Sequence, residues 1–592
     1  MIFKTSWRAA SALMFCLSLA ACGGGGGSDT SSPSSSPPLV VAEKPATRQE
    51  AARFLTQATF GPTDTEIDRV MSVGYAAWID EQFALPAVSH RSHWEARDAE
   101  IKAANLANNT TNSAGQDQVL ESFWKQAVGG PDQLRQRSVY ALSQIFVISM
   151  VDSGVANDTR AVAAWMDMLG TQGLGTYREL LEAVSRHPVM GIYLSHLRNQ
   201  KADTRSGRVP DENYAREVVQ LFSIGLVELN EDGSARTTGG ARVDTYTPAD
   251  ISGLAKVFTG WSYACPAWPD SGCFFSGSAN GVSDPDRGFK PMLGYPLFHS
   301  PEEKRFLGTT IAVQAQSDPS ASLRTALDAL ANHANVGPFI GRQLIQRLVT
   351  SNPSPAYVRD VARTFANNGS GARGDMKAVI KAVLMHPEAR AQSDASGKLR
   401  EPVLRLSAFL RAFGFRSDTG YFRVGNTENP GTTLGQTPMR SPSVFNFYRP
   451  GYVAPGTGSA ARNLVSPEMQ ITHETSTAGY VNYMRDNVSQ GVGAGNSTVN
   501  GVVLNRRDLQ PDFSAELALA TDPPALVDRV LAKLSYGNVG AALRTDIVDT
   551  VGRFTIPAAT ATNQAAVDAA KRTRVNIAVL LVLASPEYAV QR

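Results

Sequence analysis

From Thr47 onward, apolar residues recur three and four positions apart, and runs that alternate apolar with polar residues are few. This spacing constrains the fold most strongly, because it places apolar side chains on one face of a helix with about 3.6 residues per turn. With 43% hydrophobic residues, the chain has enough apolar surface for a large core. We therefore predict a mainly α fold, a multi-helical globular body with long irregular loops and at most minor β hairpins.

Helix start and stop signals occur within this pattern. Thr63-Asp64-Thr65-Glu66 has the form of a capping box, and Gly74 is a typical helix end. Thr247-Pro248-Ala249-Asp250 combines an N-cap residue, a proline at the first helical position and an acid in the first turn. These signals predict one helix that ends at Gly74 and another that continues to about Trp261.

The N-terminal residues indicate where in the cell the protein is located. Lys4 and Arg8 precede an apolar run over residues 9–20, which is shorter than a membrane-spanning helix. The run ends in Leu19-Ala20-Ala21-Cys22, which is similar to the lipobox of bacterial lipoproteins. We predict a lipoprotein signal peptide at residues 1–21 and lipidation of Cys22, which would attach the protein to a membrane. The alternatives are an uncleaved anchor and an ordinary signal peptide.

Residues 22–46 are rich in Gly, Ser and Pro, which predicts a flexible lipidated tether. Gly23, rather than Asp, follows the cysteine, and this pattern is typical of lipoproteins sent to the outer membrane. We predict a lipid-anchored protein of the cell envelope, at the outer membrane. Residues 47–592 form the body, and their number allows two subdomains, about 47–315 and 316–592.

Charge and motifs exclude several classes of function. The formal net charge is only +2, and no basic run marks a nucleic-acid partner. The sequence has neither a Gly-x-Ser-x-Gly nucleophile elbow nor a Walker lysine. We therefore predict no nucleic-acid partner and no cofactor, whereas metal binding is left open.

Two cysteines remain in the predicted mature body. Cys265 and Cys273 bracket Pro-Ala-Trp-Pro-Asp-Ser-Gly, a short loop that an oxidising periplasm would allow to close as a disulfide. A two-cysteine zinc site is the alternative, but no histidine lies at zinc-finger spacing. The pair belongs to a long irregular segment at about 262–313, and a second such segment runs over about 417–463. Loops of this length are usually functional or disordered, and their aromatic residues favour order.

A polar row on one predicted helix is the strongest candidate for chemistry. Asn213, Arg216, Glu217 and Gln220 lie at i, i+3, i+4 and i+7, which places them on one helical face. Facing a cleft, the row could hold a carboxylate base or a hard cation, whereas facing water or the core it would be structural. His299, beside acids in a loop, is the histidine with the best setting for function. The candidate catalytic residues are therefore Glu217, Asn213 and His299.

Several longer motifs resemble a known bacterial family. They begin with Arg53-Phe-Leu-Thr-Gln-Ala-Thr-Phe-Gly-Pro-Thr63 and include Glu212-Asn-Tyr-Ala-Arg-Glu217, Leu399-Arg-Glu-Pro402 and Ser441-Pro-Ser-Val-Phe-Asn-Phe-Tyr448. The chain resembles domain-of-unknown-function family 1800 from about Arg53 to Arg592. The resemblance implies a secreted, largely helical protein, without an assigned activity.

The resemblance also implies a partner. Members of family 1800 are often encoded beside a secreted family, number 1501, which looks related to the alkaline-phosphatase and sulfatase group. A secreted family-1501-like protein is therefore the predicted protein partner. Family members often have His-Asp where this chain has His299-Ser300, and this departure argues against a metal site in that loop.

Two hypotheses for function follow. The preferred one is a cell-envelope interaction or assembly protein, whose segments at about 262–313 and 417–463 bind a secreted partner or a surface polymer. The alternative is an envelope hydrolase with a carboxylate-based site around Glu217. The sequence does not decide whether the protein is an enzyme, but convergence of Glu217, Asn213 and His299 in a concave site would favour the hydrolase.

Overall fold

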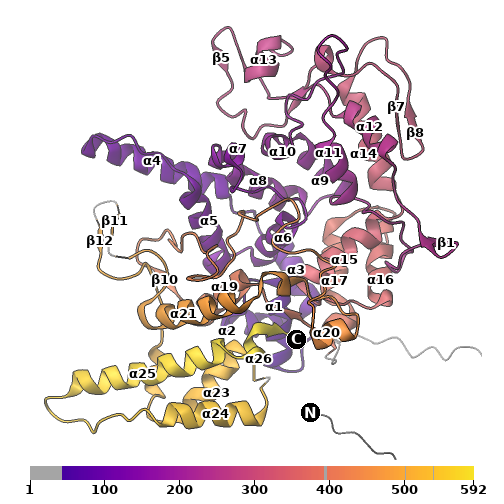
Figure 1. The fold of residues 1–592 in the computed structure, drawn as a ribbon. Coiled ribbons are helices and arrows are strands. Elements are labelled where there is room, and N and C mark those ends of the chain that lie inside the picture. Colours follow the sequence, from indigo (N-terminus) through magenta and orange to yellow (C-terminus); the bar gives the residue numbers. More distant parts are fainter. Residues whose placement is uncertain (1–42, 392–395, 496, 500–501, 538) are drawn as a thin grey trace, which may run out of the picture. The chain divides into compact units, whose positions relative to one another are not determined.

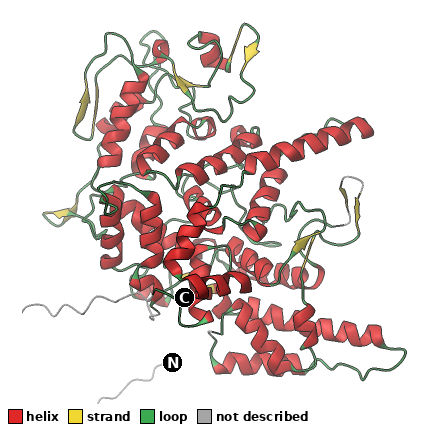
Figure 2. Cartoon of the chain, turned by 180° about the vertical axis from the view of Figure 1, so that it is seen from behind, coloured by secondary structure: helices red, strands yellow, loops and turns green. Residues whose placement is uncertain are grey.

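The computed structural model describes residues 43–391, 396–495, 497–499, 502–537 and 539–592, and this part of the chain is mainly helical (Figure 1). Figure 2 shows the strands as short segments between helices. All of the described strands pair in antiparallel two-stranded sheets. The predicted mainly α fold with minor β hairpins is confirmed.

The first part of the chain forms a group of helices that pack on one another. The helix α8 contacts α4, α6 and α9, while α1 packs against α2 and α3 against α6. The helices are α1 (Arg48–Ala58), α2 (Asp64–Val73), α3 (Tyr75–Ala84), α4 (His90–Asn108), α5 (Gln116–Gly129), α6 (Gln133–Ser143), α7 (Ser153–Ala156), α8 (Thr159–Gln172), α9 (Tyr177–Arg186) and α10 (Pro188–Tyr193).

The middle part alternates helices with short hairpins. The helix α12 packs against α11, α14 and β7, and α15 packs against both α16 and α17. The helices are α11 (Asn213–Gln220), α12 (Pro248–Val257), α13 (Ser271–Ser276), α14 (Pro319–Asn332), α15 (Val336–Leu348), α16 (Pro355–Ala366), α17 (Met376–Met385), α18 (Pro387–Arg390) and α19 (Pro402–Ala412).

The last part of the chain is a helical layer, drawn in orange and yellow in Figure 1. The helix α25 contacts α21, α23 and α24, and α19 contacts α23. The helices are α20 (Gly458–Ala461), α21 (Glu474–Gln490), α22 (Ser514–Ala518), α23 (Pro523–Leu534), α24 (Ala541–Gly552), α25 (Gln564–Leu583) and α26 (Pro586–Ala589).

The short strands connect segments that are near and far in sequence. Two sheets join distant parts of the chain, because β9 pairs with β14 and β10 pairs with β13. The strand pairs are β1 (Thr237–Thr238) with β2 (Ala241–Arg242), β3 (Trp261–Ser262) with β6 (Leu293–Gly294), β4 (Ser278–Ala279) with β5 (Val282–Ser283), β7 (Lys304–Phe306) with β8 (Thr309–Ile311), β9 (Lys398–Leu399) with β14 (Val590–Gln591), β10 (Arg416–Ser417) with β13 (Leu509–Gln510), and β11 (Ser497–Val499) with β12 (Val502–Leu504).

The capping box predicted at Thr63 and the N-cap predicted at Thr247 are both present, and the second is a capping box as well. The Thr63 hydroxyl accepts a hydrogen bond from the Glu66 amide at 3.3 Å, and Glu66 accepts one from the Thr63 amide at 3.2 Å. Thr247 and Asp250 make the same reciprocal pair at the start of α12. Each box satisfies amide donors that have no partner inside the helix, which explains why these helices begin where the sequence predicts.

The predicted end of α12 at about Trp261 is wrong. The helix ends at Val257, and Trp261 already belongs to β3. The chain turns at Gly260, whose φ is +78°, and a Cβ there would lie 2.8 Å from the His299 amide nitrogen. Glycine is therefore required at this position, and its turn directs the chain into the next strand.

One large core extends through the helical body, and it includes the fully buried Trp124 and Trp165. A second, small core is formed by Cys265, Cys273, Phe274, Ala279 and Tyr295. We call the segment around it, residues 261–298, the disulfide lobe. The lobe is also joined to the body, because Trp261 and Met292 belong to the large core and the Met292 amide donates to the Arg186 carbonyl at 2.7 Å.

The described residues belong to one compact unit, which the contact pattern assigns to residues 41–592. The division into subdomains near residue 315 stays a prediction. The signal peptide at residues 1–21, Cys22 and the tether up to residue 42 lie outside the described residues. Residues 43–46 are described, and the Tyr75 amide donates to the Glu43 carbonyl at 3.1 Å, so this end of the predicted tether contacts the body. Within the part of the chain that the structure describes, none of the helices combines the length and the apolar character that a membrane span needs.

Candidate functional site

The predicted polar row lies on α11, but its members have different surroundings. Asn213 is exposed and donates from Nδ2 to the Ser195 hydroxyl at 3.3 Å. Arg216 forms an ion pair of 3.2 Å with Glu212, which lies four residues earlier in the chain. The row therefore runs from solvent at Asn213 toward the interior at Glu217.

Glu217 is buried, with 7% of its surface exposed. Its Oε2 atom makes no hydrogen bond to any described residue. Burial raises the pKa of the Glu217 carboxyl, and the charge of Arg216 opposes this effect. A carboxyl in this setting is biased toward its protonated form, as in a general acid, but a core residue would show the same bias.

His299 is fully buried beneath the turn at Gly260. Its Nδ1 lies 2.8 Å from the Thr259 carbonyl, and its Nε2 lies 3.0 Å from the Ser322 hydroxyl. Burial lowers the pKa of His299 to about 4. The ring is therefore neutral, with Nδ1 donating and Nε2 accepting, and both nitrogens are occupied.

No hydrogen bond or ion pair joins any two of Glu217, Asn213 and His299 in the described structure. The described residues also contain no group of three or more His, Cys, Asp or Glu side chains that could hold a metal ion. The structure thus places the three predicted catalytic residues in separate polar settings.

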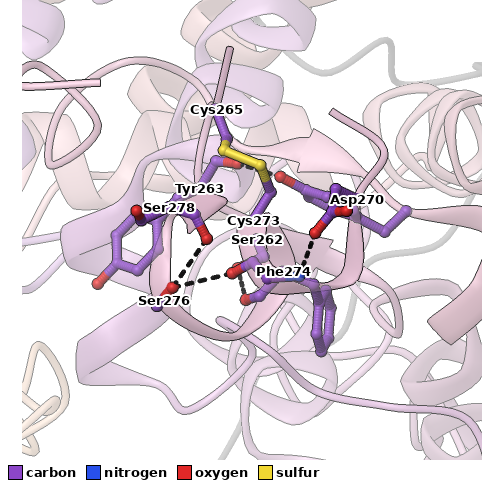
Figure 3. Close-up of a disulfide and its surroundings, with 10 residues drawn as sticks. Ser262, Tyr263, Cys265, Asp270, Cys273, Phe274, Ser276 and Ser278 are labelled. Carbon is purple, nitrogen blue, oxygen red and sulfur yellow. Dashed lines mark hydrogen bonds between the residues drawn. A yellow bond between two sulfur atoms is a disulfide. The ribbon is translucent and has the colours of Figure 1, made fainter. Parts of the chain in front are cut away.

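The disulfide predicted between Cys265 and Cys273 is present (Figure 3). It closes the turn that leads into α13, where Asp270 caps the helix by accepting from the Gly272 amide at 2.7 Å. The Ser262 hydroxyl donates to the Phe274 carbonyl at 2.6 Å, which ties β3 to the same helix. Covalent and hydrogen-bonded links together fix the backbone of the disulfide lobe.

Large apolar side chains of the disulfide lobe face outward. Trp268 is 48% exposed, Phe275 is 50% exposed and Leu297 is 63% exposed. The Phe275 and Phe298 rings pack edge to face with centroids 5.2 Å apart, so Phe275 has a defined position. Single exposed apolar residues are common on protein surfaces, but several on one segment make the lobe a candidate interaction site.

A cleft of about 310 Å³ lies beneath Trp268, between the disulfide lobe and the helices α9 and α14. The Trp268 indole donates from Nε1 to the Gly294 carbonyl at 3.0 Å, which fixes the plane of the ring. The walls combine apolar with charged groups, and they include Trp261, Trp268, Leu293, Glu182, Arg186 and Arg324.

The charged groups of this cleft are unevenly paired. Glu182 accepts from Arg186 at 3.1 Å and from Arg178 at 2.9 Å. Burial raises the pKa of Glu182, but these two arginines hold it below its ordinary value. Arg324 is exposed and has no hydrogen bond or ion pair with any other described residue. Two arginines, Arg186 and Arg324, thus line the cleft with one carboxylate, and the cleft favours an anionic ligand.

A second hollow, of about 860 Å³, lies beside α4 and α5. Its charged groups neutralise one another, because Arg97 pairs with Glu121 at 2.9 Å and also contacts Glu100. The guanidinium of Arg97 also covers the Tyr421 ring, 3.5 Å from its centroid. This hollow therefore offers a ligand less unpaired charge than the cleft beneath Trp268.

A buried set of charged residues was missed by sequence reasoning. Glu401, at the start of α19, accepts on Oε2 from Tyr140 at 2.8 Å and from Gln436 at 2.7 Å. Lys398 and Glu468 form an ion pair of 2.9 Å with almost no exposed surface. We call this set the Glu401 cluster, and it comprises Arg137, Tyr140, Gln144, Arg347, Lys398, Glu401, Gln436, Tyr448 and Glu468.

Several polar atoms of the Glu401 cluster have no hydrogen-bond partner among the described residues, including Glu401 Oε1, Glu468 Oε2 and the Tyr448 hydroxyl. Burial raises the pKa of Glu401, but Lys398 and Arg137 hold it below its ordinary value. Burial raises the pKa of Glu468 above its ordinary value, against the effect of Lys398. The sequence contains only one signal for this cluster: two of the motifs that resemble family 1800, Leu399–Pro402 and Ser441–Tyr448, contain cluster residues.

Fold and site together describe a large helical protein with a disulfide-closed lobe and a buried charged cluster. A family model described as "Protein of unknown function (DUF1800)" matches residues 53–590, so the chain belongs to this family. No curated protein and no solved structure matches the chain. The family resemblance stated from the motifs is therefore confirmed, and function has to be inferred from the site.

Proposed function

We propose that this protein is a lipid-anchored binding protein of the cell envelope, which works with a secreted partner or a surface polymer. The observation that carries the proposal is the outward display of Trp268, Phe275 and Leu297 on the disulfide lobe. Exposing such side chains to water costs free energy of about 25 cal/mol per Å² of apolar surface. A binding partner that covers them recovers this free energy.

The disulfide lobe is also built to keep its shape. It has a core of its own, and the Cys265–Cys273 bond closes the loop that carries Trp268. A rigid surface binds with a smaller loss of conformational entropy than a flexible loop. The lobe is therefore the element that we assign to binding.

The proposal includes location. Lipidation of Cys22 would hold the body at the outer membrane, with residues 22–42 as the tether. Several acyl chains give firm attachment, because each buried methylene contributes about 0.8 kcal/mol. Mass spectrometry of the mature N-terminus should find an acylated Cys22, and fractionation should recover the protein with the outer membrane. An unmodified Cys22 in a soluble fraction would contradict the anchor.

Capture of envelope components tests the binding role. The mature protein, immobilised through a C-terminal tag, is incubated with solubilised envelope from its own cells, and bound material is quantified. We expect Leu297→Ser to reduce capture at least tenfold. Leu106→Ser is the matched control, because Leu106 is 90% exposed but lies on α4, outside the lobe. Equal capture by both variants would overturn the assignment to the lobe.

One observation favours the hydrolase as a second candidate. Glu217 has a buried, unpartnered Oε2 and a raised pKa, which are properties of a general acid. If Glu217 is catalytic, Glu217→Gln should abolish hydrolysis of envelope material and leave folding and capture intact. If Glu217 is structural, the same variant should alter the free energy of unfolding without affecting any hydrolysis.

A secreted family-1501-like protein is a candidate for the partner that the immobilised protein captures from the envelope.

A further inference from the structure

We propose that the cleft beneath Trp268 binds a uronate, a sugar ring that bears a carboxylate, as part of an acidic envelope polysaccharide. This inference rests on the proposed binding function and names the ligand class. The cleft volume of about 310 Å³ lies at the lower end of small-molecule pockets, which range over about 300–1,000 Å³. It can accept one or two sugar rings, but not a folded protein.

Trp268 supplies a flat apolar wall for the ring. The indole is half exposed, yet its plane is fixed by the hydrogen bond from Nε1 to the Gly294 carbonyl. The C–H face of a sugar ring can pack on this plane, while its hydroxyl groups remain in water. Tryptophan suits such a position because it combines a large apolar surface with a polar edge.

Arg324 supplies the charge that selects a carboxylate. Its guanidinium lines the cleft and has no partner among the described residues, so it is free to bind a ligand. A planar guanidinium can donate two parallel hydrogen bonds to one carboxylate. Arg186, on the α9 side, adds positive charge, although one of its hydrogen bonds goes to Glu182.

Glu182 does not compete for Arg324. Each of its oxygens is engaged, Oε1 by Arg186 and Oε2 by Arg178. The ion pair also orients Arg186, whose Nε donates to the Met292 carbonyl at 3.2 Å. The charged wall of the cleft is therefore fixed before any ligand enters, which reduces the entropy cost of binding.

The combination of walls distinguishes a uronate from simpler anions. A phosphate or sulfate ion would use Arg324 but would gain nothing from the exposed face of Trp268. A neutral sugar would use the indole face but would leave Arg324 unpaired. A uronate uses both groups at once, and the disulfide between Cys265 and Cys273 holds the loop on which Trp268 lies.

Isothermal titration of the full mature chain tests this assignment. The probes are trimers of galacturonate, mannuronate and glucuronate, together with trigalactose as the neutral counterpart. We expect at least one uronate trimer to bind at least tenfold more tightly than trigalactose. Trp268→Ala and Arg324→Gln should each weaken that binding at least tenfold, and Arg324→Gln should remove the preference for the acidic trimer.

Two conservative variants and one control keep the test independent of folding. Trp268→Tyr and Arg324→Lys should retain part of the affinity, because they keep a flat ring and a positive charge. Leu106→Ser should leave the affinity unchanged, because Leu106 is exposed on α4 and does not line the cleft. Thermal unfolding of each variant confirms that the body is intact.

The assignment is overturned if no uronate trimer binds, or if binding is indifferent to Trp268 and Arg324. Tighter binding of a peptide with an aromatic C-terminal residue and a free carboxylate would replace the sugar with a protein terminus. Loss of uronate binding alone leaves the binding function standing if Leu297→Ser still reduces envelope capture at least tenfold. If uronate binds but capture is indifferent to the lobe, the proposed function fails while the sugar site remains.

Discussion

The Glu401 cluster and the disulfide lobe arrange polarity and burial in opposite ways. In the cluster, Glu401 and the Lys398–Glu468 ion pair are enclosed by helices, with almost no exposed surface. In the lobe, Trp268 and Leu297 are about half exposed or more. Buried charges are costly unless they are paired, and exposed apolar groups are costly unless they are covered. The cost of burying charge and the cost of exposing apolar surface therefore suggest different roles for the cluster and the lobe.

The Glu401 cluster connects parts of the chain that are far apart in sequence. Arg137 on α6 donates to the Arg347 carbonyl at 2.6 Å, and Arg347 on α15 donates to the Gln144 carbonyl at 2.8 Å. Buried charged networks of this kind tolerate only one arrangement of their partners. The cluster therefore holds the body together, whereas the lobe is the element that we propose for binding.

Loss of a buried charge should have the largest effect. Glu401→Ala removes the acceptor of Tyr140 and Gln436 and leaves the nearby Arg137 without its carboxylate. We expect the free energy of unfolding to fall by about 3–5 kcal/mol, as for other broken buried pairs. Urea unfolding followed by circular dichroism measures this change.

The matched control is Glu303→Ala, whose partner Arg305 lies on the surface. Exposed ion pairs contribute about 0–1 kcal/mol. If the two substitutions cost the same, the Glu401 cluster does not have the structural role assigned to it.

Acid should weaken the body through its buried histidines. Burial lowers the pKa of His299 to about 4 in the folded state, whereas the unfolded side chain titrates near 6.5. The stabilising contribution is therefore complete above pH 6.5 and is lost as the pH falls toward 4. The shift of the His299 pKa from 6.5 to about 4 corresponds to roughly 3 kcal/mol in the free energy of unfolding, because each pKa unit is worth about 1.4 kcal/mol.

Unfolding free energies measured between pH 4 and 7 check this dependence. His299→Gln should make the curve less steep, because the amide does not titrate in this range. Part of the dependence should remain, because burial also lowers the pKa of His187 to about 3 and that of His196 to about 4. His473→Gln, at an exposed N-cap, is the control for substitution of a surface histidine. A curve that His299→Gln does not alter would show that burial of this ring does not govern the acid response.

Removal of the disulfide should loosen the lobe without unfolding the body. Cys265→Ser combined with Cys273→Ser opens a loop of sequence separation 8. We expect the local opening free energy of the lobe to fall by about 2.5 kcal/mol, from the chain entropy of so short a loop. Hydrogen exchange should show faster exchange within residues 261–298 only. Faster exchange throughout the helices would show that the disulfide supports the whole body and not the lobe alone.

Substitution of Trp268 should have the smallest effect on stability. Trp268→Ala removes an exposed ring and its hydrogen bond to Gly294, which together contribute less than about 1 kcal/mol. The midpoint of thermal unfolding should therefore stay within a few degrees of the wild type. A larger fall would mean that the ring supports the fold rather than a ligand.

Local signals explain what could be predicted from the sequence. The caps at Thr63 and Thr247 and the disulfide depend on residues close in the chain, and all three were predicted correctly. The end of α12 was not predicted correctly. The turn at Gly260 is set by the close approach of the His299 backbone, which lies far away in sequence.

Long-range contacts explain what was missed. Glutamate and arginine are usually exposed, so nothing local marks Glu401 or Arg137 as buried partners. The segment over 417–463 was predicted to bind a partner, and that role stays a prediction, but the structure shows that it supplies Gln436 and Tyr448 to the interior. Likewise Arg324 and Trp268 share a cleft although α13 and several short strands separate them in sequence.

Envelope capture by the double variant Phe275→Ser, Leu297→Ser, measured beside its free energy of unfolding, tests whether binding resides in the disulfide lobe. Both side chains are at least half exposed, so we expect the free energy of unfolding to change by less than about 1 kcal/mol. We expect capture to fall at least tenfold in the same sample. Full capture by this stable variant would contradict the account.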